Sequence, residues 1–332
     1  VAGDDDQMLY SFLGATVEPI LTSLPEDQKR ILSQSYRLPR KILEVSQRVI
    51  QRLGENRQEK DFAPRTDEDG NVVEGEFDRR PYTYRQPAPL VQEVEERAGE
   101  GEEVMILSSC GYMLWKTISG LRKRGLPFHN PYRVTRGDWN PLRSTAKRVA
   151  TFMQMGSEDA TIPYDSRNLW RWIEMLRASQ TLQHGAKSEI QQAAARGKLV
   201  GEDQLLEWFT PELIEALLQQ DVSWIHERMT KRFTEAAEFP VQIAKERGPE
   251  ALLEEPNITV GTIHSVKGGE ADTVFLFPDL SQQAWETFQQ SSKNAGHDII
   301  RMAYVGMTRA RENLYLCHPS STRLSWRAVL QI

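Results

Sequence analysis

Short runs of apolar and β-branched residues occur in the first and last parts of the chain, with helical patterns between them. Such runs, bounded by polar residues, are typical of buried strands, and apolar residues at steps of three and four are typical of amphipathic helices. The runs that predict strands are 104–107, 126–128, 258–260, 273–277 and 314–316. The steps that predict helices cover 25–54, 115–121 and 297–311.

The N-terminal part departs from this pattern in three places. Pro39 interrupts the helical spacing and suits the first turn of a helix, so a second helix is predicted to begin there. The polar stretch 54–80 includes Asp67–Asn71 and predicts a loop or a hairpin. Residues 1–7 are predicted to be the end of a buried strand that runs into a loop.

The middle of the chain, 134–255, has no strand pattern and consists of one amphipathic helix after another. Because strands and helices alternate on both sides of it, we predict an α/β domain with a parallel sheet, interrupted by an all-helical insertion. The predicted sheet domain comprises 23–133 and 256–332, and 1–22 precede it. Four tryptophans at helical spacings are predicted to be mostly core residues of the insertion: Trp170, Trp172, Trp208 and Trp224.

Composition and charge exclude several classes of protein. Hydrophobic residues make up 39% and charged residues 27%, which is typical of a globular chain and not of a disordered one. The net charge of −6 excludes a wholly basic nucleic-acid coat but not a local basic groove. Two cysteines cannot form a disulfide framework. No window approaches the roughly 18–20 apolar residues of a membrane span. No signal peptide is recognisable, and we expect a cytoplasmic protein that does not bind membranes.

The first candidate segment for chemistry is Gly3–Ala15. The side-chain amide of Gln7, at the tip of the predicted strand, can hydrogen-bond a phosphate oxygen or a water molecule. The rings of Tyr10 and Phe12 can stack on nucleic-acid bases. An acidic turn followed by a hydrophobic helix start would explain the same residues.

The second segment is Ser35–Pro39. Arg37 could pair with a phosphate while the neighbouring ring of Tyr36 stacks on a purine. Tyr-Arg pairs are also common on helix surfaces, and this alternative stays open.

The third segment, Val260–Glu270, is a predicted strand that runs into a glycine-rich loop. Backbone amides in such a loop can approach a phosphate closely, and Glu270 could accept a hydrogen bond from a ribose hydroxyl. Alternatively, His264 is an ordinary loop histidine and Lys267 is a solvated charge.

The fourth segment is Tyr304–Arg311, where a predicted helix carries Arg309. A guanidinium that projects from such a helix into a cleft can act as an arginine finger, which meets the charge that develops on a transferred phosphoryl group. An amphipathic helix with an exposed arginine is the alternative.

Together and in this order, the four segments resemble motifs III to VI of the UvrD/Rep family of superfamily 1A DNA helicases. The resemblance covers 1–133 and about 256–317. Motif III corresponds to Gly3–Ala15, motif IV to Ser35–Leu43, motif V to Thr259–Phe275 and motif VI to Arg301–Leu316. The segment 134–255 corresponds by position alone to the family's inserted 2B domain.

The resemblance implies a RecA-like domain 2A that shares ATP with a second RecA-like domain, while single-stranded DNA crosses both. It implies that Gln7 senses the γ-phosphate, that Tyr36 stacks on the adenine and that Glu270 holds the ribose. Arg37 and Arg309 are implied to contact the γ-phosphate. The implied DNA contacts are Tyr10, Phe12, Thr262 and His264.

Two elements of the family are absent from the sequence. There is no Gly-x-x-x-x-Gly-Lys-Ser/Thr loop and no strand that ends in the Asp-Glu pair that would hold Mg²⁺. We therefore expect 1–22 to be a remnant of domain 1A, with the missing N-terminal helicase domain supplying the Mg²⁺ ligands. The isolated chain is expected to lack ATPase activity.

The main hypothesis is thus the C-terminal part of an ATP-dependent 3′→5′ DNA helicase that acts on single-stranded DNA or a single/double-strand junction near the nucleoid. A non-catalytic, helicase-derived module that binds DNA or a partner is the alternative. A helicase–nuclease subunit is a third possibility, although the sequence contains no nuclease carboxylate cluster.

Overall fold

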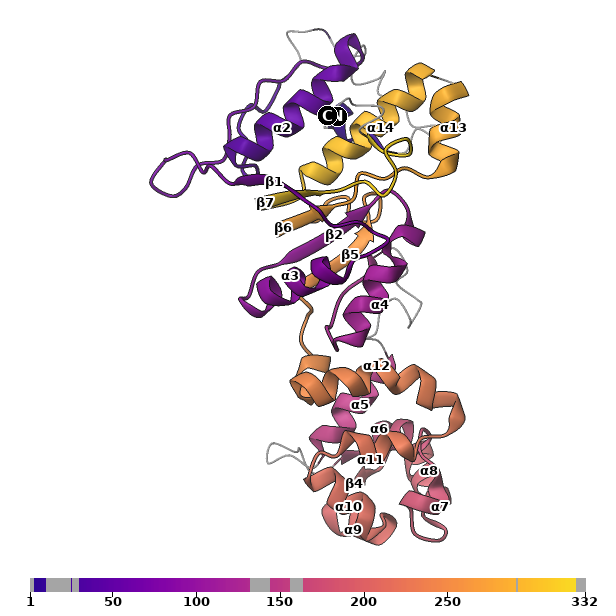
Figure 1. Cartoon of the computed structure of the whole chain (residues 1–332). Helices are drawn as coiled ribbons and strands as arrows, with labels where there is room; N and C mark the ends of the chain where they lie inside the picture. Colours follow the sequence, from indigo (N-terminus) through magenta and orange to yellow (C-terminus); the bar gives the residue numbers. More distant parts are fainter. Residues whose placement is uncertain are drawn as a thin grey trace. The chain divides into compact units, whose positions relative to one another are not determined.

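The computed structural model describes residues 3–9, 25, 30–131, 144–155, 164–290 and 292–326. The chain divides into two compact units (Figure 1). A sheet unit comprises Val1–Gly120, Asn130–Tyr132 and Asn257–Ile332, and a helical unit comprises Leu121–His129 and Arg133–Pro256. The strand expected at 1–7 lies partly outside the described residues, and Asp5–Gln7 form a short 3₁₀ helix, η1, instead.

The sheet unit is built on five strands in the order β1-β7-β6-β2-β5, and every pairing is parallel. The predicted α/β class is therefore confirmed. The strands are β1 Glu76–Arg80, β2 Val104–Ser108, β5 Ile258–Thr262, β6 Ala271–Leu276 and β7 Ala310–Cys317.

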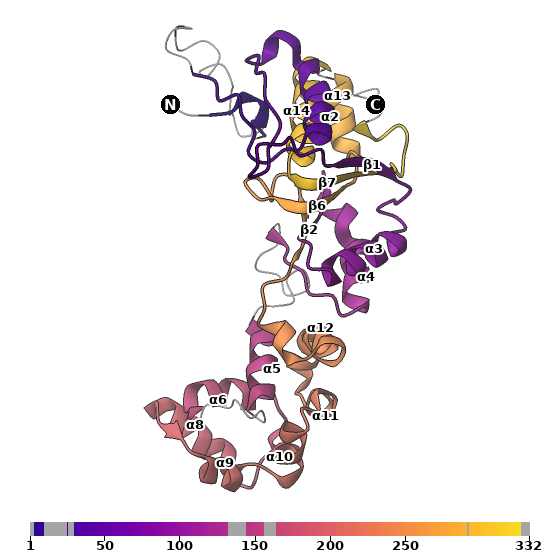
Figure 2. The same cartoon turned by 90° about the vertical axis from the view of Figure 1, so that its left-hand side faces the viewer.

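Helices cover both faces of this sheet (Figures 1 and 2). Helices α2 (Arg40–Ile50), α13 (Gln282–Gln290) and α14 (Ser292–Met307) lie on one face. Helix α3 (Ala88–Gly99) and the beginning of α4 (Trp115–Lys123) lie on the other. Strands buried on both sides need apolar residues at every position, which explains why β2 is an uninterrupted apolar run up to Ser108.

The structure corrects some predictions for the N-terminal part of the sheet unit and confirms others. The described residues 30–38 are not helical; the backbone around Ser35 instead bonds to Ala63. The second helix predicted at Pro39 is confirmed, because Pro39 is the N-cap of α2. Leu38 precedes a proline and so avoids the helical region, which separates the helix from the residues before it. The loop or hairpin predicted around Asp67–Asn71 is confirmed by an antiparallel bridge between Thr66 and Val72. The end of the polar stretch forms strand β1, which lies at the edge of the sheet and so tolerates polar residues. Helix α3 was not predicted.

Eight α-helices lie wholly within the helical unit in its described residues, and a 3₁₀ helix, η7 (Pro249–Leu252), follows them. The α-helices are α5 Ser144–Gln154, α6 Ser166–Ile173, α7 Ala178–Thr181, α8 Ala186–Arg196, α9 Glu202–Trp208, α10 Pro211–Leu218, α11 Val222–Glu227 and α12 Lys231–Arg247. The insertion is not purely helical, because Tyr164–Asp165 (β3) pairs with Leu199–Val200 (β4). Residues 126–128 form no strand, and Phe128 packs on Phe239 of α12 instead.

The tryptophans of the helical unit divide into two pairs. Trp172 and Trp208 are buried core residues, and the indole N–H of Trp208 donates to Glu189 at 2.8 Å. Trp170 and Trp224 are only partly buried, and the Arg228 guanidinium lies 3.7 Å from the centroid of the Trp224 ring. In the part of the chain that the structure describes, no helix is both long and apolar enough to cross a membrane.

Candidate functional site

Arg309 occupies the tight turn between α14 and β7, one residue before β7 begins. The helix predicted over 297–311 therefore ends earlier than expected, at Met307. The side chain of Arg309 is 1% exposed, which contradicts the alternative of an exposed surface arginine.

The buried guanidinium of Arg309 is held by neutral acceptors. It donates to the carbonyl oxygens of Val305 at 2.9 Å and Gly269 at 3.2 Å, and to the Thr308 hydroxyl at 3.1 Å. Its fourth acceptor is the Gln7 side-chain oxygen at 3.4 Å. Among the described residues, no carboxylate forms an ion pair with it. Burial, together with the nearby charge of Arg37, lowers the pKa of Arg309 to about 10.

Arg37 lies beside Arg309 and connects two loops of the sheet unit. Its guanidinium pairs with the Glu270 carboxylate and donates to the carbonyl oxygen of Thr308 at 3.3 Å. Glu270 immediately precedes β6 and lies 3.8 Å from the Arg311 guanidinium. Arg37 belongs to an irregular segment before α2, so the surface-helix alternative for Tyr36 and Arg37 is wrong.

Gln7 joins this group from η1 (Asp5–Gln7). Its side-chain nitrogen donates to Asp4 at 2.7 Å, which leaves its oxygen turned to Arg309. The structure therefore brings four of the residues singled out from the sequence into one cluster: Gln7, Arg37, Glu270 and Arg309.

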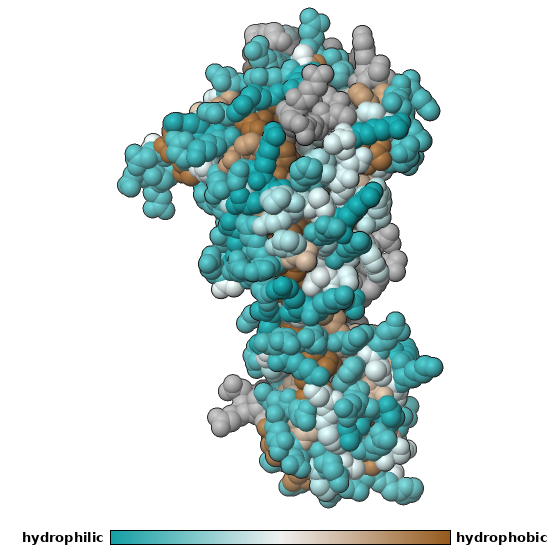
Figure 3. All heavy atoms as spheres, viewed as in Figure 1, coloured by the Kyte–Doolittle hydropathy of each residue, from teal (hydrophilic) through white to brown (hydrophobic). Residues whose placement is uncertain are grey.

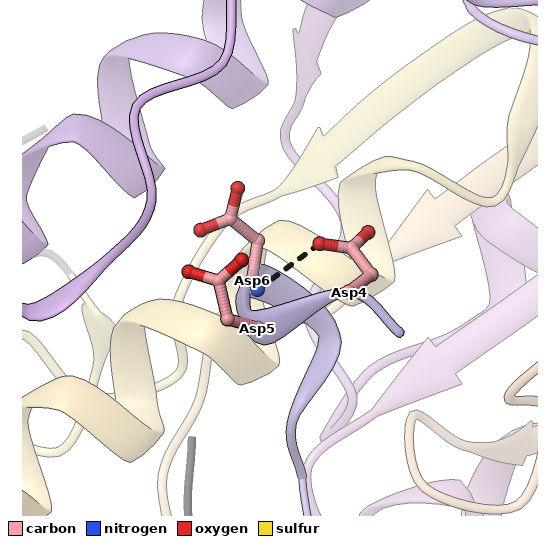
Figure 4. A group of neighbouring side chains, drawn as sticks. All are labelled: Asp4, Asp5 and Asp6. Carbon is pink, nitrogen blue, oxygen red and sulfur yellow. Dashed lines mark hydrogen bonds between the residues drawn. The ribbon is translucent and has the colours of Figure 1, made fainter. Parts of the chain in front are cut away.

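The three aspartates next to Gln7 lie side by side on one short segment (Figure 4). Two cations, Lys60 and Arg57, bond to them. The Lys60 ammonium bonds Asp4 at 3.1 Å, Asp6 at 2.8 Å and also Asp5. The Arg57 guanidinium donates two hydrogen bonds, of 2.9 and 2.7 Å, to the two carboxylate oxygens of Asp6. We name Lys60, Arg57 and the three aspartates the aspartate clamp. It fastens the segment that carries Gln7 to the sheet unit.

Contacts within the aspartate clamp stabilise the charged forms of Asp6 and Lys60. Burial opposes ionisation of Asp6, yet bonds from Arg57 and Lys60 outweigh it and lower the Asp6 pKa. Burial likewise opposes the charge on Lys60, but the three aspartates raise the Lys60 pKa above its usual value. The sequence interpretation missed Lys60 and Arg57. Three adjacent aspartates beside apolar residues need nearby cations if they are buried, because an unpaired buried carboxylate is costly. The sequence could have indicated such cations on this ground.

Thr262 and His264 lie at the carboxyl end of β5. Thr262 is buried, and its hydroxyl accepts from the Ser265 N–H at 3.3 Å, so it caps the turn that follows the strand. His264 is half-buried; burial lowers its pKa, while a hydrogen bond to the Leu9 backbone opposes the shift. Its partly exposed ring agrees both with an ordinary loop histidine and with a contact to DNA.

The remaining predicted site residues lie apart from this cluster or outside the description. The Tyr36 side chain is 87% exposed, so its ring is free to stack on a ligand. Tyr10 and Phe12 lie outside the described residues.

Comparison with known proteins matches residues 211–321 to the family model of the UvrD-like helicase C-terminal domain. Over these residues the chain is similar to UvrD-like helicases. The matched region runs from α10 to the residues after β7, and it includes both Glu270 and Arg309.

Part of the chain is also similar to curated DNA helicases. Two proteins described as probable DNA helicase II homologs, from Rickettsia conorii and Rickettsia felis, are each 35% identical over 77 residues, which is 22% of this chain and 12% of each relative. DNA helicase II of Rickettsia typhi is 32% identical over 76 residues, which is 22% of this chain and 11% of the relative. The matches thus span about an eighth of the length of these relatives.

Proposed function

We propose that this chain is the C-terminal part of an ATP-dependent 3′→5′ DNA helicase or translocase, in which Arg37 and Arg309 contact the γ-phosphate of ATP. In this proposal Glu270 holds the ribose, Tyr36 stacks on the adenine and Gln7 senses the γ-phosphate. The observation that carries it is the Arg309 guanidinium, which is 1% exposed and has only neutral partners among the described residues.

The chemistry of this donor set fits a phosphate. A buried guanidinium whose partners are carbonyl and hydroxyl oxygens has its hydrogen bonds satisfied but its charge uncompensated. A phosphate oxygen would supply the missing negative charge, and two guanidiniums side by side suit a group that carries several such oxygens. The low pKa of Arg309, about 10, has the same origin, because burial and Arg37 both disfavour its cation.

The residues of this chain would act by binding and positioning. ATP supplies the phosphoryl group whose developing charge the two guanidiniums would stabilise. Glu270 would keep Arg37 in place through their ion pair, and Gln7 would exchange its bond with Arg309 for a phosphate contact. Loss of the γ-phosphate would remove these contacts, which would couple hydrolysis to a change in domain position.

The aspartate clamp does not fit Mg²⁺. Although Asp4, Asp5 and Asp6 lie close enough together to hold a cation, Lys60 already bonds all three carboxylates. We therefore propose that the Mg²⁺ ligands belong to an N-terminal helicase domain that completes the nucleotide site. Tyr10, Phe12, Thr262 and His264 are the proposed contacts to single-stranded DNA or a single/double-strand junction.

Steady-state ATPase assays test the proposal. The isolated chain, mixed with ATP, Mg²⁺ and oligo-dT, is expected to show no turnover above background. In the intact protein, Arg37→Ala is expected to lower kcat by about 10³-fold, as loss of an arginine finger does. Because Arg37 is partly exposed, this variant is expected to fold, and Arg309→Lys probes the buried partner.

Arg40→Ala is the matched control, since Arg40 lies three residues further along and pairs on the surface with Glu74 at 3.0 Å. Its kcat is expected to stay within about twofold of the wild-type value, as for most surface changes. Robust turnover by the isolated chain would overturn the shared nucleotide site. Wild-type kcat in Arg37→Ala would overturn its role as an arginine finger and favour the non-catalytic module.

A further inference from the structure

An apolar groove of about 370 Å³ lies on helices α9 (Glu202–Trp208) and α10 (Pro211–Leu218) of the helical unit. Its apolar lining comes from both helices and the turn between them: Leu206, Phe209, Pro211, Ile214 and Leu218. We name it the α9–α10 groove. It lies wholly in the helical unit and shares no residue with the nucleotide site.

Two leucines of the groove are open to solvent. Leu218 and Leu206 are 67% and 51% exposed. Full burial of a leucine side chain stabilises a protein or a complex by about 1.5–3 kcal/mol, so both leucines would gain free energy if a partner covered them. Figure 3 shows hydrophobic atoms on the edge of the helical unit where Figure 1 labels α9 and α10. Exposed apolar patches rimmed by polar residues are typical of interaction sites.

Hydrogen bonds within the helical unit hold the segments that form the groove. The Thr210 hydroxyl caps α10 by accepting from the Leu213 N–H, and the Gln183 N–H donates to the Trp208 carbonyl at 2.9 Å. The side chain of Phe209 is 2% exposed and forms part of the floor. A partner would therefore meet a rigid surface, which keeps the entropic cost of binding low.

The two helices that form the groove are acidic, and Glu215 of α10 lines the groove itself. From 199 to 227 the chain contains no lysine or arginine. The acidic residues in this stretch are Glu202, Asp203, Glu207, Glu212, Glu215, Asp221 and Glu227. Acidic helices repel the phosphates of nucleic acid and of anionic lipid headgroups, and they attract a basic polypeptide. Arg177 and Arg228 lie with Glu212 and Glu227 in a separate, neighbouring pocket and do not line the groove.

We propose that the α9–α10 groove binds a basic amphipathic helix of a partner protein. Ile214 and Leu218 are one turn apart on α10, so the groove matches a helix that offers apolar side chains at positions i and i+4. Lysine or arginine residues flanking those anchors would pair with the acidic side chains of α9 and α10. The proposal stands whether or not the nucleotide site works as described above.

A random-peptide display selection against the full chain tests this directly, with Leu206→Ser/Leu218→Ser as counter-bait. Both leucines are exposed, so the double variant is expected to fold, which circular dichroism checks. Peptides that prefer the wild-type chain are expected to be rich in lysine and arginine, with apolar residues four positions apart. Their fluorescence anisotropy is expected to show at least tenfold weaker binding to the double variant and weaker binding at 500 than at 50 mM NaCl.

Leu253→Ser is the matched control, because Leu253 is 44% exposed in the same unit and does not line the groove. It is expected to leave peptide binding unchanged. Selection of acidic or neutral peptides, or of none that prefers the wild-type chain, would overturn the proposal. So would a concentration-dependent dimer that the double variant abolishes in sedimentation, because the occupant would then be a second copy of the chain.

Discussion

Replacing Lys60 with methionine removes the ammonium at the centre of the aspartate clamp. That ammonium lies 3.1 Å from an oxygen of Asp4 and 2.8 Å from one of Asp6, and it also bonds Asp5. Methionine has a similar length and no charge, so the substitution tests the charge rather than the packing. The Lys60 pKa is raised, so the wild-type side chain is a cation throughout the neutral range.

The magnitude follows from the burial of the clamp. Loss of Lys60 leaves Arg57 as the remaining cation of the clamp against three carboxylates, and Asp5 and Asp6 are only 1% and 0% exposed. Water therefore cannot replace the ammonium, and removal of one partner from a buried ion pair costs about 3–5 kcal/mol. Opening of the segment 3–9 becomes easier by at least about 3 kcal/mol, which corresponds to roughly 150-fold.

Hydrogen exchange measures this opening without requiring global unfolding. The N–H groups of Asp6 and Gln7 donate to Asp4, and that of Gln58 donates to the Asp5 carboxylate. Hydrogen exchange of these three groups is expected to accelerate by about 150-fold in Lys60→Met. Lys41→Met, at an exposed lysine of α2, is expected to change none of these rates.

Neutralising one acid should restore part of the protection. Adding Asp5→Asn to Lys60→Met lowers the uncompensated negative charge, so exchange is expected to slow again. Acceleration of less than about threefold in Lys60→Met would refute the reasoning, because the clamp would then contribute almost nothing to holding the segment.

Two further predictions concern stability. Burial raises the pKa of Asp279 from 3.8 to about 6. The folded state thus holds this proton more tightly than the unfolded state, and this residue's contribution to stability falls as the pH rises from 4 to 6. The free energy of unfolding of Asp279→Asn, measured relative to that of the wild type by urea titration, is therefore expected to rise by up to about 3 kcal/mol from pH 4 to pH 7. If this difference in unfolding free energy stays constant with pH, the reasoning is contradicted. Gly75→Ala is expected to destabilise the fold by more than about 2 kcal/mol, because φ is +65° and a Cβ would lie 2.6 Å from Pro39. Gly101→Ala, where φ is +91° and nothing lies nearby, is expected to cost about 1 kcal/mol by thermal unfolding, and equal losses would refute the steric argument.

The pattern of apolar residues predicted those strands in which every residue is buried, such as β2. Strand β2 was predicted because apolar residues are required along its length when helices cover both faces of a sheet. Strand β1 was missed because it lies at the edge, where its sequence Glu-Phe-Asp-Arg-Arg contains a single apolar residue. Residues 126–128 have the apolar character of a strand, yet Phe128 is buried against a helix. Apolar character alone therefore predicts burial and not the kind of element.

The sequence by itself determined the parallel α/β class and the order of its motifs, because hydrophobic periodicity is a local property. It also singled out Gln7, Arg37, Glu270 and Arg309 as candidate site residues. Only the tertiary structure decided that these four side chains meet, since they come from segments up to 302 residues apart. The same holds for Lys60, which lies 54–56 residues from the aspartates that it neutralises. A charge is stabilised by what lies near it in space, and spacing along the chain does not record that distance.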